Sequence, residues 1–118
     1  MDLPRITSSE EICIGTALTD ESAFDTINLQ EEDFGDGLVA RIWRAITSLS
    51  IRGAPTNDLG LVRAELVRIG LSEITIDLLT QMRSTAVAVE LVGQHATIVK
   101  EFAARRKMIC DAQIAVET

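Results

Sequence analysis

The stretch LVGQHATIVKEFAARRKMICDAQIAVET, residues 91–118, decides the fold because its side chains repeat at the spacing of an α-helix. Large or apolar residues step along it by three and four positions without a break, which is the period of one helical face. A helix from about Ala86 to Val116 would be roughly 45 Å long at the standard rise per residue. No Gly or Pro follows the last periodic residue to end this helix.

A helix of this length is too long to be covered by a domain of 118 residues, so part of its surface is expected to contact a partner. We call the periodic face the α-stripe and expect self-association through it. His95 is interpreted as a packing or interface histidine, and His95 and Arg105 are expected at the edge or paired with acids such as Glu101. The residues of the α-stripe, which are also the candidate self-association residues, are Leu91, His95, Ile98, Phe102, Arg105 and Ile109.

Four shorter segments upstream also carry helical signals, over residues 8–19, 23–29, 38–53 and 57–70. Asp36 is placed to cap the third of these helices, and Asn57 or Asp58 is placed to cap the fourth. Gly53 and Gly70 follow the last apolar residues of these two helices and are expected to end them in the left-handed conformation. The chain therefore predicts several short helices before the long one.

Two details of this helical pattern depend on local sequence alone. Ser8 and Glu11 have the spacing of a capping box, which predicts that the first helix begins at Ser8. EITIDLL (73–79) and AVAVELV (86–92) both alternate apolar and polar or small residues, so each fits a strand or a helix. Periodicity does not decide between these alternatives in runs this short.

Composition favours one all-α domain. Hydrophobic residues make up 47% of the chain, which argues against disorder, and three Phe, one Trp and no Tyr imply an aliphatic core of packed helices. Trp43 lies beside Ile42 and Ile46 of the apolar helix face and is interpreted as a core residue. No uncharged apolar run of about 18 residues is present, and the start MDLPRITSSEE has no signal-peptide pattern, so we expect no membrane contact and a cytoplasmic location.

Charge and cysteine content exclude other classes of function. Residues 1–36 hold ten acidic residues against Arg5 alone, and residues 37–118 hold eight acidic and ten basic residues. The acidic N-terminal segment repels the phosphate backbone of DNA, so we do not expect the chain alone to bind DNA. The basic run Arg105–Lys107 is interpreted as a solvated helix face. Cys13 and Cys110 are far apart and are expected to be buried free thiols.

No catalytic, cofactor-binding or metal-binding site is predicted. The sequence has no G-x-x-x-x-G-K-[ST] loop for phosphate, and one His with two distant Cys forms no recognisable ligand set. The acidic run EEDF (31–34) lies on a polar turn, where solvated charge and helix capping explain it. No group of residues in the sequence therefore supports an enzymatic function.

The order of these pieces resembles the N-terminal domain of DnaB-type replicative DNA helicases over nearly the whole chain. No single motif is specific to this family, but the ordered set of motifs at matching spacing is. The matching positions are Pro4, Glu10-Glu11, Gly15, Asp20, Ala23-Phe24, LQEEDF (29–34), Arg41, Ile42, Trp43, Ala45, Ile46, Leu49, Gly53, Pro55, Leu66, Gly70-Leu71, Ser84, HATIV (95–99) and Arg105-Arg106.

Three departures mark a divergent member, of the kind that a phage or plasmid encodes. Ala40 stands near the place where the family commonly has His, and SEITIDLLTQM (72–82) replaces the usual Gly-Gly and aromatic-Leu. His95 stands where the family usually has Tyr. The resemblance nevertheless favours helices over strands in both ambiguous segments.

The resemblance implies an all-α fold, with a small helical bundle head over residues 1–83 and one long helix over residues 84–118. That helix would be the first arm of a helical hairpin for packing between subunits, and the ATPase domain, with ATP and Mg²⁺, would lie outside this chain. The implied function is the collar of a hexameric helicase, which associates with itself and docks primase and, in some systems, a helicase loader. Single-stranded DNA would be contacted only through the assembled ring.

A second hypothesis is of a different class. A free-standing adaptor or decoy could bind a replicative helicase or its primase through the same surface. A coding sequence for an ATP-binding domain downstream would favour the collar, and a stop codon after Thr118 would favour the adaptor.

Overall fold

The computed structural model describes residues 7–117, with side chains described from residue 8 to residue 112. This part of the chain is all-helical and contains no strand, which confirms the predicted fold class. The elements are α1 (Thr7–Ala17), α2 (Ala23–Ile27), the 3₁₀ helix η1 (Glu31–Asp33), α3 (Gly37–Ile51), α4 (Leu59–Arg68), α5 (Ile76–Arg83) and α6 (Val89–Glu117).

The helices α1 to α5 and η1 form the head, with α1 at its centre. Helix α1 packs against α2, α3, α5 and α6, while α4 packs against α3 and α5. As expected, the core is mainly aliphatic. Its largest fully buried apolar side chains are Trp43, Ile14, Leu18, Ile42, Ile46, Leu49, Leu66, Ile74 and Leu79.

Trp43 is a core residue, as predicted. It is 1% exposed, and its ring stacks on Phe24 with the ring centroids 5.1 Å apart. Its Nε1 donates a hydrogen bond of 3.0 Å to the carbonyl oxygen of Leu29, so the one polar atom of the indole is satisfied inside the core.

Most of the predicted helix ends are confirmed. The Asp36 carboxylate accepts hydrogen bonds from two amides at the start of α3, and Asp58 accepts one at the start of α4. Gly53 and Gly70 have φ values of 72° and 87°, so both helices end in the left-handed region that glycine adopts without strain. The prediction at Ser8 is wrong, because α1 already includes Thr7 and Ser8 lies inside the helix.

The two ambiguous segments are not strands. In EITIDLL, the Thr75 hydroxyl accepts a hydrogen bond from the Leu78 amide and begins α5, so Ile76 and Leu78 lie in a helix. In AVAVELV, residues 86–88 connect the head to α6, which begins at Val89. Helix α6 therefore starts three residues later than the expected Ala86, and it continues to Glu117.

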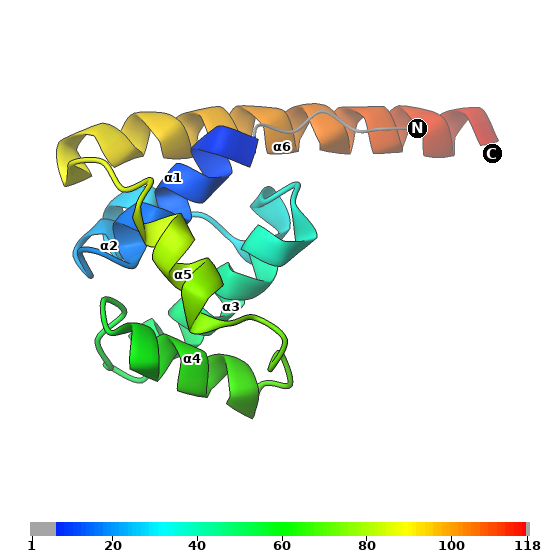
Figure 1. Cartoon of the computed structure of the whole chain (residues 1–118). Coiled ribbons are helices and arrows are strands. Elements are labelled where there is room, and N and C mark those ends of the chain that lie inside the picture. The colour runs from blue at the N-terminus through cyan, green and yellow to red at the C-terminus, as the bar shows by residue number, and fades with distance from the viewer. Residues whose placement is uncertain (1–6, 118) are drawn as a thin grey trace.

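Helix α6 lies along one side of the head, and its C-terminal part extends past the head into solvent (Figure 1). It contacts α1, α2 and η1. The longest dimension of the molecule is 47 Å, against 33 and 24 Å in the other directions. The prediction of a long helix that the head does not cover along its whole length is confirmed for the described residues.

Candidate interaction surface

Two rows of side chains run along α6, and the head buries one of them more deeply than the other. We call the row that faces the head the head-facing row: Val92, Ala96, Val99, Ala103, Arg106 and Cys110. Val92 and Val99 are 0% exposed and Ala96 is 5% exposed, whereas the last three members are half-buried. Burial in this row therefore decreases along the helix, because α6 leaves α1 and α2 behind as it extends.

The α-stripe lies on a flank of the same helix. Each of its residues stands one position before a residue of the head-facing row, and one residue is a rotation of about 100° around an α-helix. Leu91 is 49% exposed and Arg105 is also exposed, while the other four members are half-buried. The head thus leaves this apolar flank partly accessible to another molecule.

Sequence reasoning missed the head-facing row. Val92, Ala96 and Val99 also stand four and three residues apart, so the signal was present. An apolar row on a helix normally packs against its own domain. In α6 the more deeply buried row is the one with the smaller side chains, whereas the row with the larger side chains stays partly accessible to solvent.

Among the described residues, the two polar members of the α-stripe form no ion pair with Glu101, which was one of the two arrangements expected for them. His95 Nδ1 lies 3.1 Å from the hydroxyl oxygen of Ser9, a buried residue of α1, so His95 links α6 to the head. The Arg105 guanidinium lies over the ring of Phe102, 4.9 Å from its centroid, rather than pairing with Glu101. This cation–π contact shields one face of Phe102 while leaving the charge in solvent.

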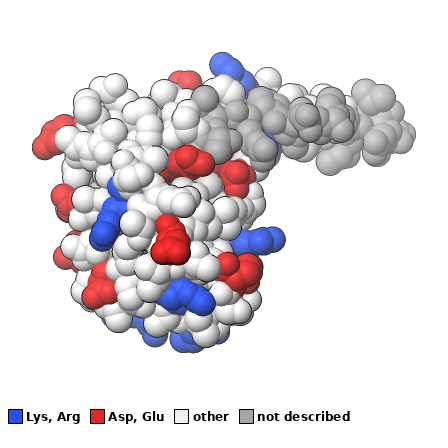
Figure 2. All heavy atoms as spheres, viewed as in Figure 1, with Lys and Arg blue, Asp and Glu red and all other residues white. Residues whose placement is uncertain are grey.

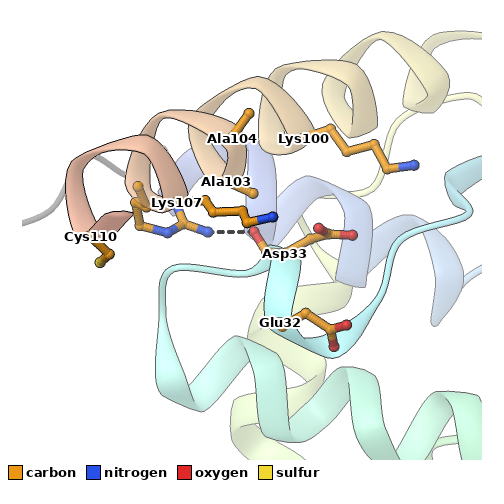
Figure 3. A pocket seen from close by; sticks show the side chains of 8 residues that line it. Glu32, Asp33, Lys100, Ala103, Ala104, Lys107 and Cys110 are labelled. Carbon is orange, nitrogen blue, oxygen red and sulfur yellow. Dashed lines mark hydrogen bonds between the residues drawn. The ribbon is translucent and has the colours of Figure 1, made fainter. Parts of the chain in front are cut away.

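A groove of about 620 Å³ opens on the other flank of α6, between this helix and η1. Figure 3 shows Lys100, Ala103, Ala104 and Lys107 on the wall formed by α6, opposite Glu32 and Asp33 of η1. The dashed line marks the hydrogen bond of 2.6 Å that the Arg106 guanidinium donates to the carbonyl oxygen of Asp33. Arg106 is half-buried, so the interpretation of the whole basic run as a solvated face is wrong at this residue.

Cys110 also lines this groove and is half-buried, so only one of the two thiols is buried as predicted. Cys13 is the buried thiol. Burial, with a smaller contribution from the negative charge of Glu10, raises the pKa of Cys13 to about 12. The thiol of Cys13 is therefore protonated and unreactive at neutral pH.

Two buried carboxylates hold the head together. Glu10 is 0% exposed and accepts hydrogen bonds of 3.0 Å from the amides of Gly35 and Asp36. Glu65 on α4 is 1% exposed and forms ion pairs with Arg52 and Arg68. These hydrogen bonds and ion pairs explain why both carboxylates are buried, and they give both residues a structural role.

Charges of both signs are interspersed over the face of the head shown in Figure 2, without a continuous basic patch there. Within residues 7–117, no helix is long and apolar enough to cross a membrane.

Comparisons with known proteins agree with this geometry. A family model described as the DnaB-like helicase N-terminal domain matches residues 2–101, so three members of the α-stripe, Phe102, Arg105 and Ile109, lie beyond the match. The chain is similar to the crystal structure of the N-terminal domain of DnaB helicase from Mycobacterium tuberculosis, with 28% identity and a TM-score of 0.92, over 98% of this chain and 85% of that chain. A search of curated proteins finds no match. The chain therefore belongs to the family of DnaB-like helicase N-terminal domains.

Proposed function

We propose that this chain is the collar and assembly domain of a hexameric replicative DNA helicase, and that it associates with other copies through the α-stripe. The observation that carries the proposal is the position of the stripe on a flank of α6 that the head leaves partly accessible. Membership of the helicase family supports the collar rather than the free-standing adaptor.

The stripe has a composition suited to a modest interface. Burying one large apolar side chain is worth roughly 1.5–3 kcal/mol, so several together offset much of the cost of association. Because four stripe residues are already half-buried, the gain per residue is at the lower end of this range. Twofold pairing of the stripe with itself is the simplest arrangement, since it closes without leaving a second adhesive surface.

Further roles follow from the collar proposal. The assembled collar would dock primase and, where one is used, a helicase loader, and it would surround single-stranded DNA in its channel. ATP and Mg²⁺ would be bound by an ATPase domain rather than by this chain, which would bind no cofactor or metal itself. The proposed location is the cytoplasm.

The site of association is tested with matched charge substitutions. Phe102→Asp places a carboxylate in the middle of the α-stripe, and Ile51→Asp places one on an apolar side chain that is 80% exposed on the head. Light scattering after size-exclusion chromatography is measured at a concentration where the wild type associates. We expect Phe102→Asp to be monomeric and Ile51→Asp to behave as the wild type, with both proteins keeping the helical spectrum. Equal association of the two variants would contradict the proposed surface.

A further inference from the structure

The turn around η1, residues 29–36, is held firmly by the head, and we call it the η1 shelf. Its first residue, Leu29, accepts the Trp43 indole hydrogen bond, and its last two residues donate their amides to the buried Glu10 carboxylate. Both ends of the shelf are therefore bonded to fully buried side chains, of Glu10 on α1 and Trp43 on α3.

The middle of the shelf is fixed as well. The Glu31 carboxylate accepts from the Arg44 guanidinium at 2.9 Å, which bonds the shelf to the outer face of α3. Inside the turn, the Asp33 carboxylate accepts from the Gln30 amide at 2.7 Å. These bonds fix the orientation of the peptide groups of the shelf, and the Asp33 carbonyl oxygen accepts a hydrogen bond from α6.

Helix α6 passes over this shelf after it has left the rest of the head. Its fully buried contacts end at Val99, and the next residues of the head-facing row, Ala103, Arg106 and Cys110, line the groove. Helix α6 contacts η1, and Arg106 bonds to it directly. The groove opens beside this contact, and the bond from Arg106 joins its two walls.

We propose that the η1 shelf sets the direction of the distal half of α6, and that Arg106 is the positioning residue that fixes the helix to it. A guanidinium suits this role because several fixed donors on one planar group leave it bonded in one orientation. Phe102 and Ile109 lie on either side of Arg106 in the helix, so the shelf would orient the α-stripe for pairing between copies. This consequence for assembly rests on the proposed function, whereas the positioning of α6 does not.

Lys107 provides a matched control. It is the next residue on α6, it carries the same charge and it lines the same groove, yet it forms no ion pair among residues 8–112. Loss of Lys107 therefore removes the same charge from the helix without removing the bond to the shelf.

The direction of α6 is measured by electron–electron resonance between two nitroxide labels. Met108 on α6 is 70% exposed and Thr80 on α5 is exposed, so Met108→Cys with Thr80→Cys provides both labelling sites. Cys110→Ser removes the competing thiol, and the buried Cys13 does not label. Excess unlabelled protein removes distances between copies. In this background we compare the parent protein with Arg106→Ala, Lys107→Ala, Asp33→Ala and the Arg106→Ala/Asp33→Ala double variant.

We expect a narrow distance distribution for the parent and Lys107→Ala, and a broad one for Arg106→Ala. Asp33→Ala should broaden it too, because the turn loses its internal bond, and the double variant should be no broader than Arg106→Ala. This non-additivity separates the bond to the shelf from the other interactions of Arg106. Amide exchange over residues 103–110 should become about tenfold faster in Arg106→Ala, which corresponds to about 1.4 kcal/mol.

Two results would overturn the inference: an Arg106→Ala distribution as narrow as that of Lys107→Ala, or additive broadening in the double variant. Thermal unfolding of each variant checks that the head remains folded. A wild type that stays monomeric would remove the proposed function while leaving the distance measurement valid, so the two failures can be told apart.

Discussion

Replacement of Gly15 by Ala should destabilise the head, although it adds a better helix former. Gly15 lies where α1 packs closely against the C-terminal end of α5. A Cβ at this position would overlap the carbonyl oxygen of Met82 and would lie 2.7 Å from the Thr85 hydroxyl oxygen. The Met82 oxygen belongs to the backbone of the last turn of α5, so it has little freedom to move.

The contacts around Gly15 set the size of the effect. Thr85 donates a hydrogen bond of 3.0 Å to the Glu11 carbonyl oxygen, and the Val87 amide donates one of 3.1 Å to the Thr16 hydroxyl. Separating α1 from α5 costs about 1–3 kcal/mol in overpacking, plus about 1 kcal/mol for each of these bonds that is lost. The higher helix propensity of Ala returns about 1 kcal/mol. With one or both bonds lost, the net decrease in the free energy of unfolding is therefore about 1–4 kcal/mol.

Urea and thermal unfolding, followed by far-ultraviolet circular dichroism, measure this loss. Gly93→Ala is the control, because Gly93 is also helical but its added Cβ would meet only the Thr26 methyl group, at 3.6 Å. We expect Gly93→Ala to be as stable as the wild type or more stable, and Gly15→Ala to melt at least about 3 °C lower. A Gly15→Ala protein as stable as Gly93→Ala would refute the close packing of α1 on α5.

Two further predictions concern ionisable groups. Mainly through the hydrogen bond from Arg68, the pKa of Glu65 is lowered from 4.5. The folded state thus binds this proton less tightly than the unfolded state, so the stabilisation is complete above pH 4.5 and is lost as the pH falls through the lowered pKa. Glu65→Gln should lose this acid dependence in urea unfolding on both sides of that pH, and an unchanged dependence would contradict the assignment. Because Cys13 is buried with a pKa of about 12, a thiol reagent should label Cys110 alone in the native protein, as read by mass spectrometry; equal labelling rates would count against this packing.

The parts of the fold that local chemistry determines could be predicted from the sequence. Asp36 and Asp58 begin helices, and Gly53 and Gly70 end them, because each acts on backbone groups within a few residues. The repeat of apolar residues that predicts the long helix α6 is also a local signal. The start of α1 was misplaced at Ser8, because a capping box is only one of several ways to begin a helix.

The parts that depend on distant contacts could not be predicted. The alternation in EITIDLL fits a strand, but Thr75 caps a helix there, and Ile74 and Leu79 are buried in the core that α1 and α4 help to form. The bond from Arg106 to the Asp33 carbonyl oxygen joins residues 73 positions apart, so no local sequence pattern predicts it. The head-facing row has a helical spacing as well, but which of the two rows packs against the head depends on contacts with α1 and α2, which lie far away in the sequence.

The central claim is that the α-stripe mediates association between copies, and sedimentation equilibrium of the wild-type chain tests it most directly. A concentration series that extends to about 100 μM covers the micromolar range expected of a modest interface. We predict a reversible increase in mass from monomer to dimer across this series. A chain that remains monomeric at the highest concentration would contradict the claim and would show that the partial burial of the stripe in the monomer is sufficient.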